Sequence, residues 1–307
     1  MLPWLIAVAA VAVACVAYGI LVERRWYRLV RRRIPILPTD HVGALTVLHL
    51  SDLHLTRRSA SMRRFLSGLP ACDLSVVTGD VVGEPEAVEA AVEAIRNLRG
   101  IQASFFVLGS NDYFVPRPYN YLHYLFRKRR RHRRAKRGRA PDLVAQLEAD
   151  GWVHLRNTRR AISLDGLEME VLGLDDPHIR RQDLRVAPRE HPRAFGLAVV
   201  HSPDPSPELA ALGYDLMVFG HTHGGQVRFP LVGPLVTNSH LPRRIASGLV
   251  RMGNAYAHIS PGLGTSKYAP FRFLCRPEAT VLELVPRAAT PDRPSSPAAR
   301  ARRIPAP

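Results

Sequence analysis

Apolar and polar positions alternate along the chain in a pattern that predicts layers of strands and helices. Runs rich in Val, Leu, Ile and Phe predict buried strands at residues 45–50, 74–78, 104–108, 169–174, 196–200 and 216–219. Apolar residues at helical spacing predict helices at residues 60–69, 85–99, 141–150 and 206–213. Further strands are expected near residues 226–229, 256–259 and 280–284. The pattern predicts an α/β fold over residues 44–285, a four-layer αββα sandwich of two mixed sheets flanked by helices.

The amino-terminal segment is uniformly apolar. Leu2 to Val22 form a run of 21 residues without a charge, and a helix needs roughly 20 residues to cross a ~30 Å hydrocarbon core. We therefore expect residues 1–23 to be a transmembrane anchor. A cleaved signal peptide is the less favoured interpretation, because no basic residue precedes the run.

Residues 24–43 are predicted to be a basic juxtamembrane linker, with Pro35 and Pro38 marking the approach to the soluble domain. Its arginines follow the apolar run closely, so the positive-inside tendency places the soluble domain in the cytoplasm. Trp26 and Tyr27 suit an interfacial anchor, or simply cover apolar surface. The sequence thus predicts a single-pass protein of the cell membrane.

The formal net charge of +17 is concentrated in appendages of the predicted domain. Residues 23–33 carry +5, residues 127–139 carry +10 and residues 286–307 carry +4, which leaves the rest of the chain close to neutral. This distribution indicates contact with an anionic surface, either a membrane or a nucleic acid.

Two of these basic segments have an expected structure. An insert at about residues 116–140 is interpreted as a polybasic element on the anionic inner leaflet, or else as a solvated charge run without a specific partner. Residues 286–307, rich in Pro, Ala and Arg, are predicted to be a disordered tail. The three scattered cysteines exclude a disulfide framework.

Side chains that suit a metal ion follow nearly every predicted strand. A single member of this set is more commonly a turn residue or a hydrogen-bonded loop histidine. Carboxyl ends of strands are where open α/β sheets place ligand sites, so five clusters in such positions predict one shared site. The clusters are, in chain order, Asp52 with His54, Asp80, Asn111 with Asp112, His201, and His221 with His223.

The order of these clusters resembles the calcineurin-like metallophosphoesterases, whose pattern is D-x-H, G-D, G-N-H-D/E, H and G-H-x-H. The resemblance covers about residues 44–285, and the segments HLSDLHL and FGHTHGGQ carry it most specifically. Within the family, the chain looks most like the membrane-associated bacterial branch of phosphodiesterases and lipid-linked pyrophosphatases.

The resemblance implies a site for two divalent metal ions, and a mixed His and carboxylate set suits Mn, Fe or Zn. A hydroxide between the ions would attack phosphorus while both cations neutralise phosphoryl charge. Carried over by residue, one ion would be held by Asp52, His54 and His223 and the other by His201 and His221, with Asp80 as the bridge.

One motif departs from the family pattern, because Gly109-Ser110-Asn111-Asp112 stands where the family has Gly-Asn-His-Asp. In strict register Ser110 takes the place of the metal-ligating Asn. We favour Asn111 as the ligand, since a serine hydroxyl is a poorer one, and expect catalysis to depend on Asn111 and Asp80. The leaving group then lacks a His general acid, which favours a good leaving group such as pyrophosphate.

Two further carboxylate groups are placed outside the predicted ligand set. Asp112 is expected to orient Asn111 or another ligand, or to be a plain turn residue. The Asp175-Asp176 turn after a predicted strand has the same two interpretations.

The sequence therefore predicts a membrane-anchored binuclear enzyme that hydrolyses a phosphodiester or pyrophosphate, with a lipid-linked substrate as a hypothesis. Two alternatives stay open. The chain could be a non-catalytic, membrane-tethered metal-binding protein disabled by Ser110, or a nuclease whose basic run binds the phosphate backbone.

Overall fold

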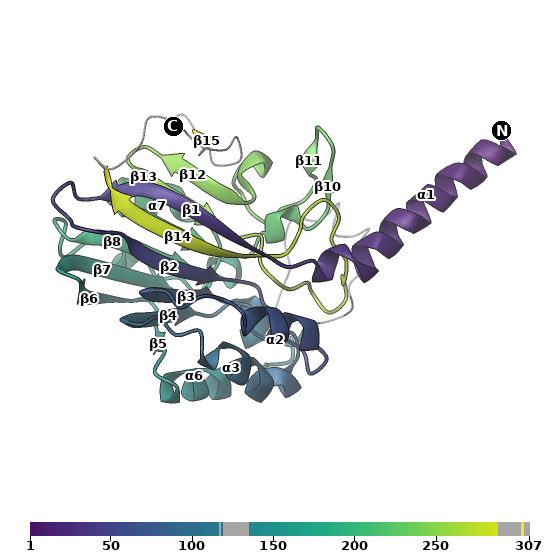
Figure 1. The fold of residues 1–307 in the computed structure, drawn as a ribbon. Helices are drawn as coiled ribbons and strands as arrows, with labels where there is room; N and C mark the ends of the chain where they lie inside the picture. The colour runs from purple at the N-terminus through teal and green to yellow at the C-terminus, as the bar shows by residue number, and fades with distance from the viewer. Residues whose placement is uncertain (117, 119–134, 288–301, 304–307) are drawn as a thin grey trace.

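The computed structural model describes the chain except for residues 117, 119–134, 288–301 and 304–307, and it shows two sheets packed face to face with helices outside them (Figure 1). The first sheet is mixed, because β1 and β14 are parallel to each other and β14 is antiparallel to β2. Its strands, in spatial order, are β1 (Arg28–Leu37), β14 (Glu278–Pro286), β2 (Leu45–Leu50), β3 (Leu74–Thr78), β4 (Ala103–Val107) and β5 (Val153–His154).

The second sheet is mixed as well, with parallel strands in its middle and an antiparallel pair toward each edge. Its strands, in spatial order, are β15 (Arg302–Arg303), β12 (Gly248–Met252), β13 (Ala255–Ile259), β9 (Leu216–Phe219), β8 (Phe195–Val200), β7 (Leu167–Leu174) and β6 (Thr158–Leu164). A separate hairpin pairs β10 (Arg228–Phe229) with β11 (Gly233–Pro234).

Alternation along the strands builds the layers. In β2, Leu45 and Val47 pack between the sheets, while Leu48 and Leu50 contact the helices outside. The helices on that outer face are α2 (Ala60–Leu66), α3 (Val88–Arg96) and α6 (Ala140–Ala149), whereas α7 (Ser206–Ala211) covers the second sheet. The four-layer αββα fold predicted from the sequence is confirmed.

The predicted linker at residues 24–43 is wrong, because most of it forms β1 at the edge of the first sheet. Ile34, Ile36 and Leu37 of this strand are buried in the core between the sheets. Pro35 is tolerated because an edge strand needs hydrogen bonds on one side only. The folded domain thus begins near Arg28 rather than at residue 44.

The remaining differences fall on short or edge strands and on undescribed segments. Strands β5, β6 and β12 were not predicted, and β6 carries exposed polar residues at a sheet edge. Residues 117 and 119–134 of the predicted basic insert lie outside the described residues. So does most of the predicted tail, from which Arg302–Arg303 pair with β12 as β15.

Helix α1 (Leu2–Leu21) extends away from the sheets and is long and apolar enough to cross a membrane (Figure 1). Its buried residue, Gly19, lies in the last turn and packs on the domain, where a Cβ would lie 2.5 Å from the Arg272 carbonyl oxygen. Just beyond it, the short 3-10 helix η1 (Glu23–Arg25) provides a buried carboxylate. Glu23 accepts hydrogen bonds from the backbone N–H groups of Leu274 and Cys275, at 2.9 and 2.5 Å. The foot of α1 is therefore fixed to the domain.

Candidate metal centre

The predicted ligands gather where strands from both sheets end. Asp52 and His54 follow β2, Asp80 follows β3, and Asn111 lies in the short helix α4 (Ser110–Tyr113) after β4. From the second sheet, His201 follows β8, and His221 and His223 follow β9. Since these strands run parallel within each sheet, their carboxyl ends meet at one edge of the sandwich.

Five of these residues have a left-handed backbone, with φ between 42° and 68°: Asp52, His54, Asp80, His221 and His223. Residues other than glycine rarely adopt such angles, and they persist where the surrounding structure enforces them. The sharp turns aim successive side chains at one point. Gly79 precedes Asp80 with φ 83°, and a Cβ there would lie 2.5 Å from the Gly109 nitrogen. Close approach of the two loops therefore requires glycine.

One group of donors consists of Asp52, His54 and His223. The two imidazole Nε2 atoms face each other at 3.2 Å, and His223 Nε2 lies 3.5 Å from Asp52 Oδ1. Within the described part of the chain, this buried carboxylate oxygen has no hydrogen-bond donor. Two imidazole nitrogens that converge beside a buried carboxylate oxygen without a hydrogen bond favour a cation, because a cation can be bound by all three atoms.

A second group is centred on Asp80. Its Oδ2 lies 3.5 Å from His54 Nε2 and 3.7 Å from His201 Nε2, so the carboxylate stands between the two groups. His201 Nε2 in turn lies 3.3 Å from His221 Nδ1. Asp52, Asp80 and His201 also have potential ligand atoms within 4.8 Å of one another. The mixed nitrogen and oxygen atoms of these groups form a candidate site for divalent metal.

Asn111 is hydrogen-bonded to the carboxylate of Asp80. Its backbone N–H donates to Asp80 Oδ1 at 2.8 Å, and its side-chain nitrogen donates to Asp80 Oδ2 at 2.6 Å. Turning the amide over would present its oxygen at the same place. This position supports Asn111, rather than Ser110, as the residue that this loop brings to the site.

Asp112 ties the two loops together. Its Oδ1 accepts hydrogen bonds from the backbone of Val81 and Val82, at 2.9 and 3.1 Å, and its Oδ2 accepts one from Gly109 at 2.9 Å. Burial raises the pKa of Asp112 to about 7, and the charge of Asp80 adds to the effect. The residue thus positions Asp80 and Asn111 relative to each other.

The imidazoles differ in protonation according to their neighbours. Burial alone would lower the pKa of His201, but the carboxylates of Asp80, Asp176 and Asp52 raise it to about 9. Burial lowers the pKa of His223 to about 4, and that of His221 falls well below its usual value. His201 is also oriented by Thr78, whose carbonyl oxygen lies 2.6 Å from its Nδ1. A cation would take the place of the proton on His201.

Two residues near the site were not included in the predicted set. Asp176 is buried, burial raises its pKa to about 7, and its charge acts on His201. His178, in the 3-10 helix η3 (Pro177–Ile179), packs against His221 with ring centroids 4.3 Å apart. The signal for both was the polar cluster after β7, which has the same position relative to its strand as the recognised clusters.

Comparison with known proteins agrees with this geometry. A family model described as calcineurin-like phosphoesterase matches residues 45–225. The uncharacterised metallophosphoesterase YkuE of Bacillus subtilis (strain 168) is 28% identical over 219 residues, which cover 69% of this chain and 68% of that protein. The phosphodiesterase YaeI of Escherichia coli (strain K12) is 27% identical over 271 residues, covering 86% and 90%.

A third relative, from Bos taurus, is described as a transmembrane protein with metallophosphoesterase domain. It is 25% identical over 257 residues, which cover 79% of this chain and 53% of that protein. The family model spans more than half of the chain and includes the motifs whose side chains meet at the sheet edge. The protein therefore belongs to the calcineurin-like phosphoesterase family and is a metal-dependent phosphoester hydrolase.

Proposed function

We propose that the protein is a binuclear enzyme that hydrolyses a phosphodiester or a pyrophosphate at a membrane surface. The observation that carries the proposal is the position of Asp80 between two histidine groups, with Asn111 on its carboxylate. A carboxylate in this position suits a bridge between two cations. Relatives described as a phosphodiesterase and as metallophosphoesterases support the same reaction class.

The residues of the site have separate tasks in this reaction. Two divalent cations, when bound, would lower the pKa of water and neutralise charge on a phosphoryl group. Asp80 lies between His54 and His201 and would contribute a ligand to both metal-binding groups. Asn111 orients Asp80 through two hydrogen bonds. The His of the third family motif is replaced by Asn111. A different histidine, His178, packs against His221 at the site. A substrate with a good leaving group suits this arrangement.

The placement of α1 supports a membrane-bound substrate. Strand β1 begins at Arg28 beside Glu278, and two residues later in β14 Thr280 pairs with His49, near the end of β2. The foot of α1 and Asp52 are therefore at the same end of the first sheet. If α1 spans the bilayer, the metal centre works close to its surface, where a lipid-linked phosphate would be presented.

The orientation of the protein follows from charge. Arg24 and Arg25 lie in η1 and Arg28 begins β1, which favours a cytoplasmic location for the domain by the positive-inside tendency. The same charges, with the basic insert, suit an anionic inner leaflet. A nucleic acid is the competing partner, and hydrolysis of single-stranded oligonucleotides in preference to lipid substrates would favour it.

The test uses the full chain in neutral detergent with bis-p-nitrophenyl phosphate and Mn²⁺, Zn²⁺ or EDTA. We expect metal-dependent turnover, reduced roughly a hundredfold or more by Asp80→Asn, since even supporting residues of metal sites contribute 10 to 100-fold. Asp165→Asn is the matched control. Like Asp80, Asp165 has a left-handed backbone, and it accepts a hydrogen bond from Gln102, which lies before β4, whereas Asn111 follows β4. Two bound metal ions per chain without turnover on phosphodiesters or pyrophosphates would instead identify a metal-binding protein.

A further inference from the structure

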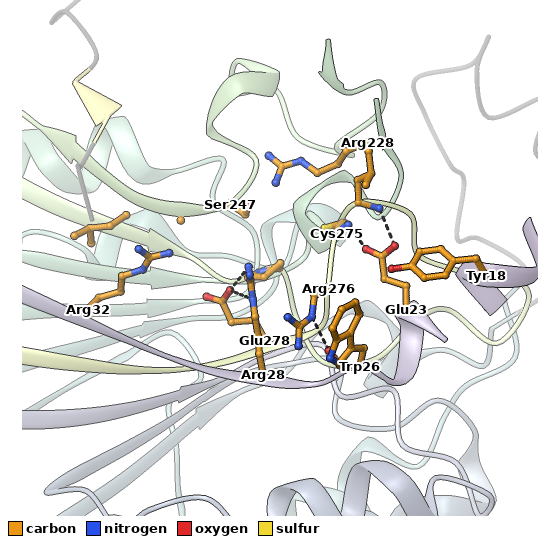
Figure 2. Close-up of a pocket in the computed structure, with 14 residues that line it drawn as sticks. Tyr18, Glu23, Trp26, Arg28, Arg32, Arg228, Ser247, Cys275, Arg276 and Glu278 are labelled. Carbon is orange, nitrogen blue, oxygen red and sulfur yellow. Dashed lines mark hydrogen bonds and ion pairs between the residues drawn. The ribbon is translucent and has the colours of Figure 1, made fainter. Parts of the chain in front are cut away.

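A cavity of about 490 Å³ lies at the carboxyl-terminal end of α1, where Tyr18, Glu23 and Trp26 line it (Figure 2). Cys275 and Pro261 line this cavity, and Cys275 Sγ donates to the His223 carbonyl oxygen at 3.3 Å. The described residues that line it include none of the predicted metal ligands. The cavity is therefore a separate site that shares a wall with the metal centre.

Arginines from different elements surround the cavity. Arg28 and Arg32 are four residues apart in β1 and so share one face of the strand, Arg228 comes from β10, and Arg276 precedes β14. Arg28 pairs with Glu278 at 2.8 Å, and Arg276 lies over the Trp26 ring at 4.0 Å. In Figure 2, Arg32 and Arg228 extend toward the middle of the group from different sides.

The acidic residues at the cavity do not neutralise it. Among the residues that the structure describes, its lining has four arginines and two carboxylates, Glu23 and Glu278. Glu278 is engaged by Arg28, and both oxygens of Glu23 accept backbone hydrogen bonds from Leu274 and Cys275. The cavity thus has an excess of positive charge and planar donors that match phosphate geometry.

An exposed apolar tip stands beside the cavity. The β10–β11 hairpin begins at Arg228, and its tip contains Leu231, which is fully exposed, and Val232, which is 64% exposed. The hairpin is joined to the foot of α1 through Phe273. The Phe273 N–H donates to Gln226 at 3.0 Å, and its ring meets Tyr18 edge to face at 6.3 Å. An exposed apolar tip next to an apolar helix is a feature of membrane contact.

We propose that this cavity binds the phosphate of an anionic phospholipid, with the acyl chains lying along α1 and the hairpin tip. Arg228 provides the guanidinium nearest the tip, and Trp26 and Leu274 line the same opening. The proposal rests on the membrane anchoring proposed above, but not on the hydrolytic reaction. A lipid held here would sit one loop away from His223.

The experiment measures binding of dihexanoyl phosphatidylglycerol to the full chain in neutral detergent, by calorimetry, with EDTA present so that the metal centre cannot contribute. Dihexanoyl phosphatidylcholine and glycerol 3-phosphate are the other ligands. They separate the anionic lipid from a zwitterionic one and from a free phosphate. The variants are Arg228→Ala and Arg228→Lys. The control is Arg160→Ala, an exposed arginine in β6 at the opposite edge of the second sheet from β12.

We expect one molecule of phosphatidylglycerol per chain, with the dissociation constant raised roughly tenfold in Arg228→Ala, less in Arg228→Lys and not at all in Arg160→Ala. Equal affinity of wild type and Arg228→Ala would overturn the proposal. So would glycerol 3-phosphate that binds as tightly as the lipid, because the site would then serve a free phosphate. Since metal is absent, loss of turnover in the assay above does not affect this result. Release of the protein from membranes by alkaline carbonate would show instead that the anchoring is wrong.

Discussion

Asn111 and Asp80 are joined by two hydrogen bonds, one from the backbone N–H to Oδ1 and one from the side-chain amide to Oδ2. Both oxygens of the carboxylate are therefore fixed by a single residue of the neighbouring loop. Asp80 is buried, and its pKa is held below its usual value: burial would raise it, but His201, His54 and these two bonds lower it. The carboxylate is thus kept ionised and correctly oriented for metal binding.

Replacing Asn111 should consequently reduce activity more than replacing Ser110. We expect Asn111→Ala to lower kcat/KM for bis-p-nitrophenyl phosphate roughly 10 to 100-fold, and Ser110→Ala to change it only about twofold. Steady-state kinetics at saturating Mn²⁺ provide the measurement. A larger loss in Ser110→Ala than in Asn111→Ala would show that the loop follows the strict register of the family motif.

Asp112 should contribute to metal affinity without touching the substrate. Asp112→Asn turns an acceptor into a donor facing the N–H of Gly109, Val81 or Val82. We expect Mn²⁺ to bind roughly 10 to 100-fold more weakly, and the free energy of unfolding to fall by about 1–3 kcal/mol. Calorimetric titration and urea unfolding measure the two effects. Asp142→Asn, at an exposed helix position, is the control, and a similar loss there would contradict the assignment.

The buried strands were the predictable part of this fold. Residues 45–50, 74–78 and 216–219 were located correctly because both faces of these strands are buried, so most of their residues are apolar. Strand β1 was missed because its first half is rich in arginine and its second half contains Pro35. An edge strand needs neither continuous apolar residues nor an N–H at every position, so its sequence resembles a linker.

A soluble fragment that begins at residue 40 should therefore not fold properly. It would lack Ile34, Ile36 and Leu37, which are buried between the sheets, and each such side chain contributes about 1.5–3 kcal/mol. It would also expose β14 as a new edge. We expect a fragment from residue 24 to unfold cooperatively and one from residue 40 to aggregate, as measured by circular dichroism and light scattering. Equal thermal stability of the two fragments would contradict this role of β1.

The site was recognisable because ligand residues must keep their identity and their place after a strand, whatever the surrounding sequence. Asp176 and His178 were harder to assign, since nothing in the spacing of a polar turn shows which side chains face inward. Their positions depend on how β7 packs beside β8, a long-range relationship that local pattern does not contain.

Two buried histidines between the sheets should give the metal-free protein an acid-sensitive stability. The rings of His49 and His258 meet with 2.8 Å between their Nδ1 atoms. Burial lowers the pKa of His49 to about 3 and that of His258 well below its usual value. Below about pH 6.5 the unfolded chain binds protons that the folded protein does not, so stability falls as the pH is lowered.

The expected loss between pH 7.5 and 5.5 is about 1.4 kcal/mol for each histidine, because one pKa unit corresponds to about 1.36 kcal/mol. Urea unfolding in EDTA at both pH values gives the difference. In the double variant His49→Leu/His258→Leu, the loss of unfolding free energy between the two pH values should be smaller by the sum of the two histidine contributions, whatever the absolute stability of the variant. An unchanged pH dependence would mean that both rings take up protons in the folded protein as readily as in the unfolded chain.

The foot of α1 should loosen when Glu23 is replaced. Glu23→Ala leaves the N–H groups of Leu274 and Cys275 without their acceptor, at a cost of about 1–3 kcal/mol. We expect faster trypsin cleavage at Arg24 or Arg25 in the detergent-solubilised protein, followed by gel electrophoresis. Glu208→Ala, at an exposed position of α7, should leave the cleavage rate unchanged.

Helix α1 continues through η1 into β1, and Glu23 also binds it to the loop at Leu274 and Cys275. No long flexible linker therefore separates α1 from the domain. The position and orientation of α1 in its surroundings therefore also fix the distance and orientation of the metal centre relative to them. If α1 is held in a bilayer and the substrate is a lipid, as proposed above, encounters between the enzyme and its substrate take place in two dimensions. The rate should then follow the number of substrate molecules per unit area of bilayer rather than their concentration in the bulk solution.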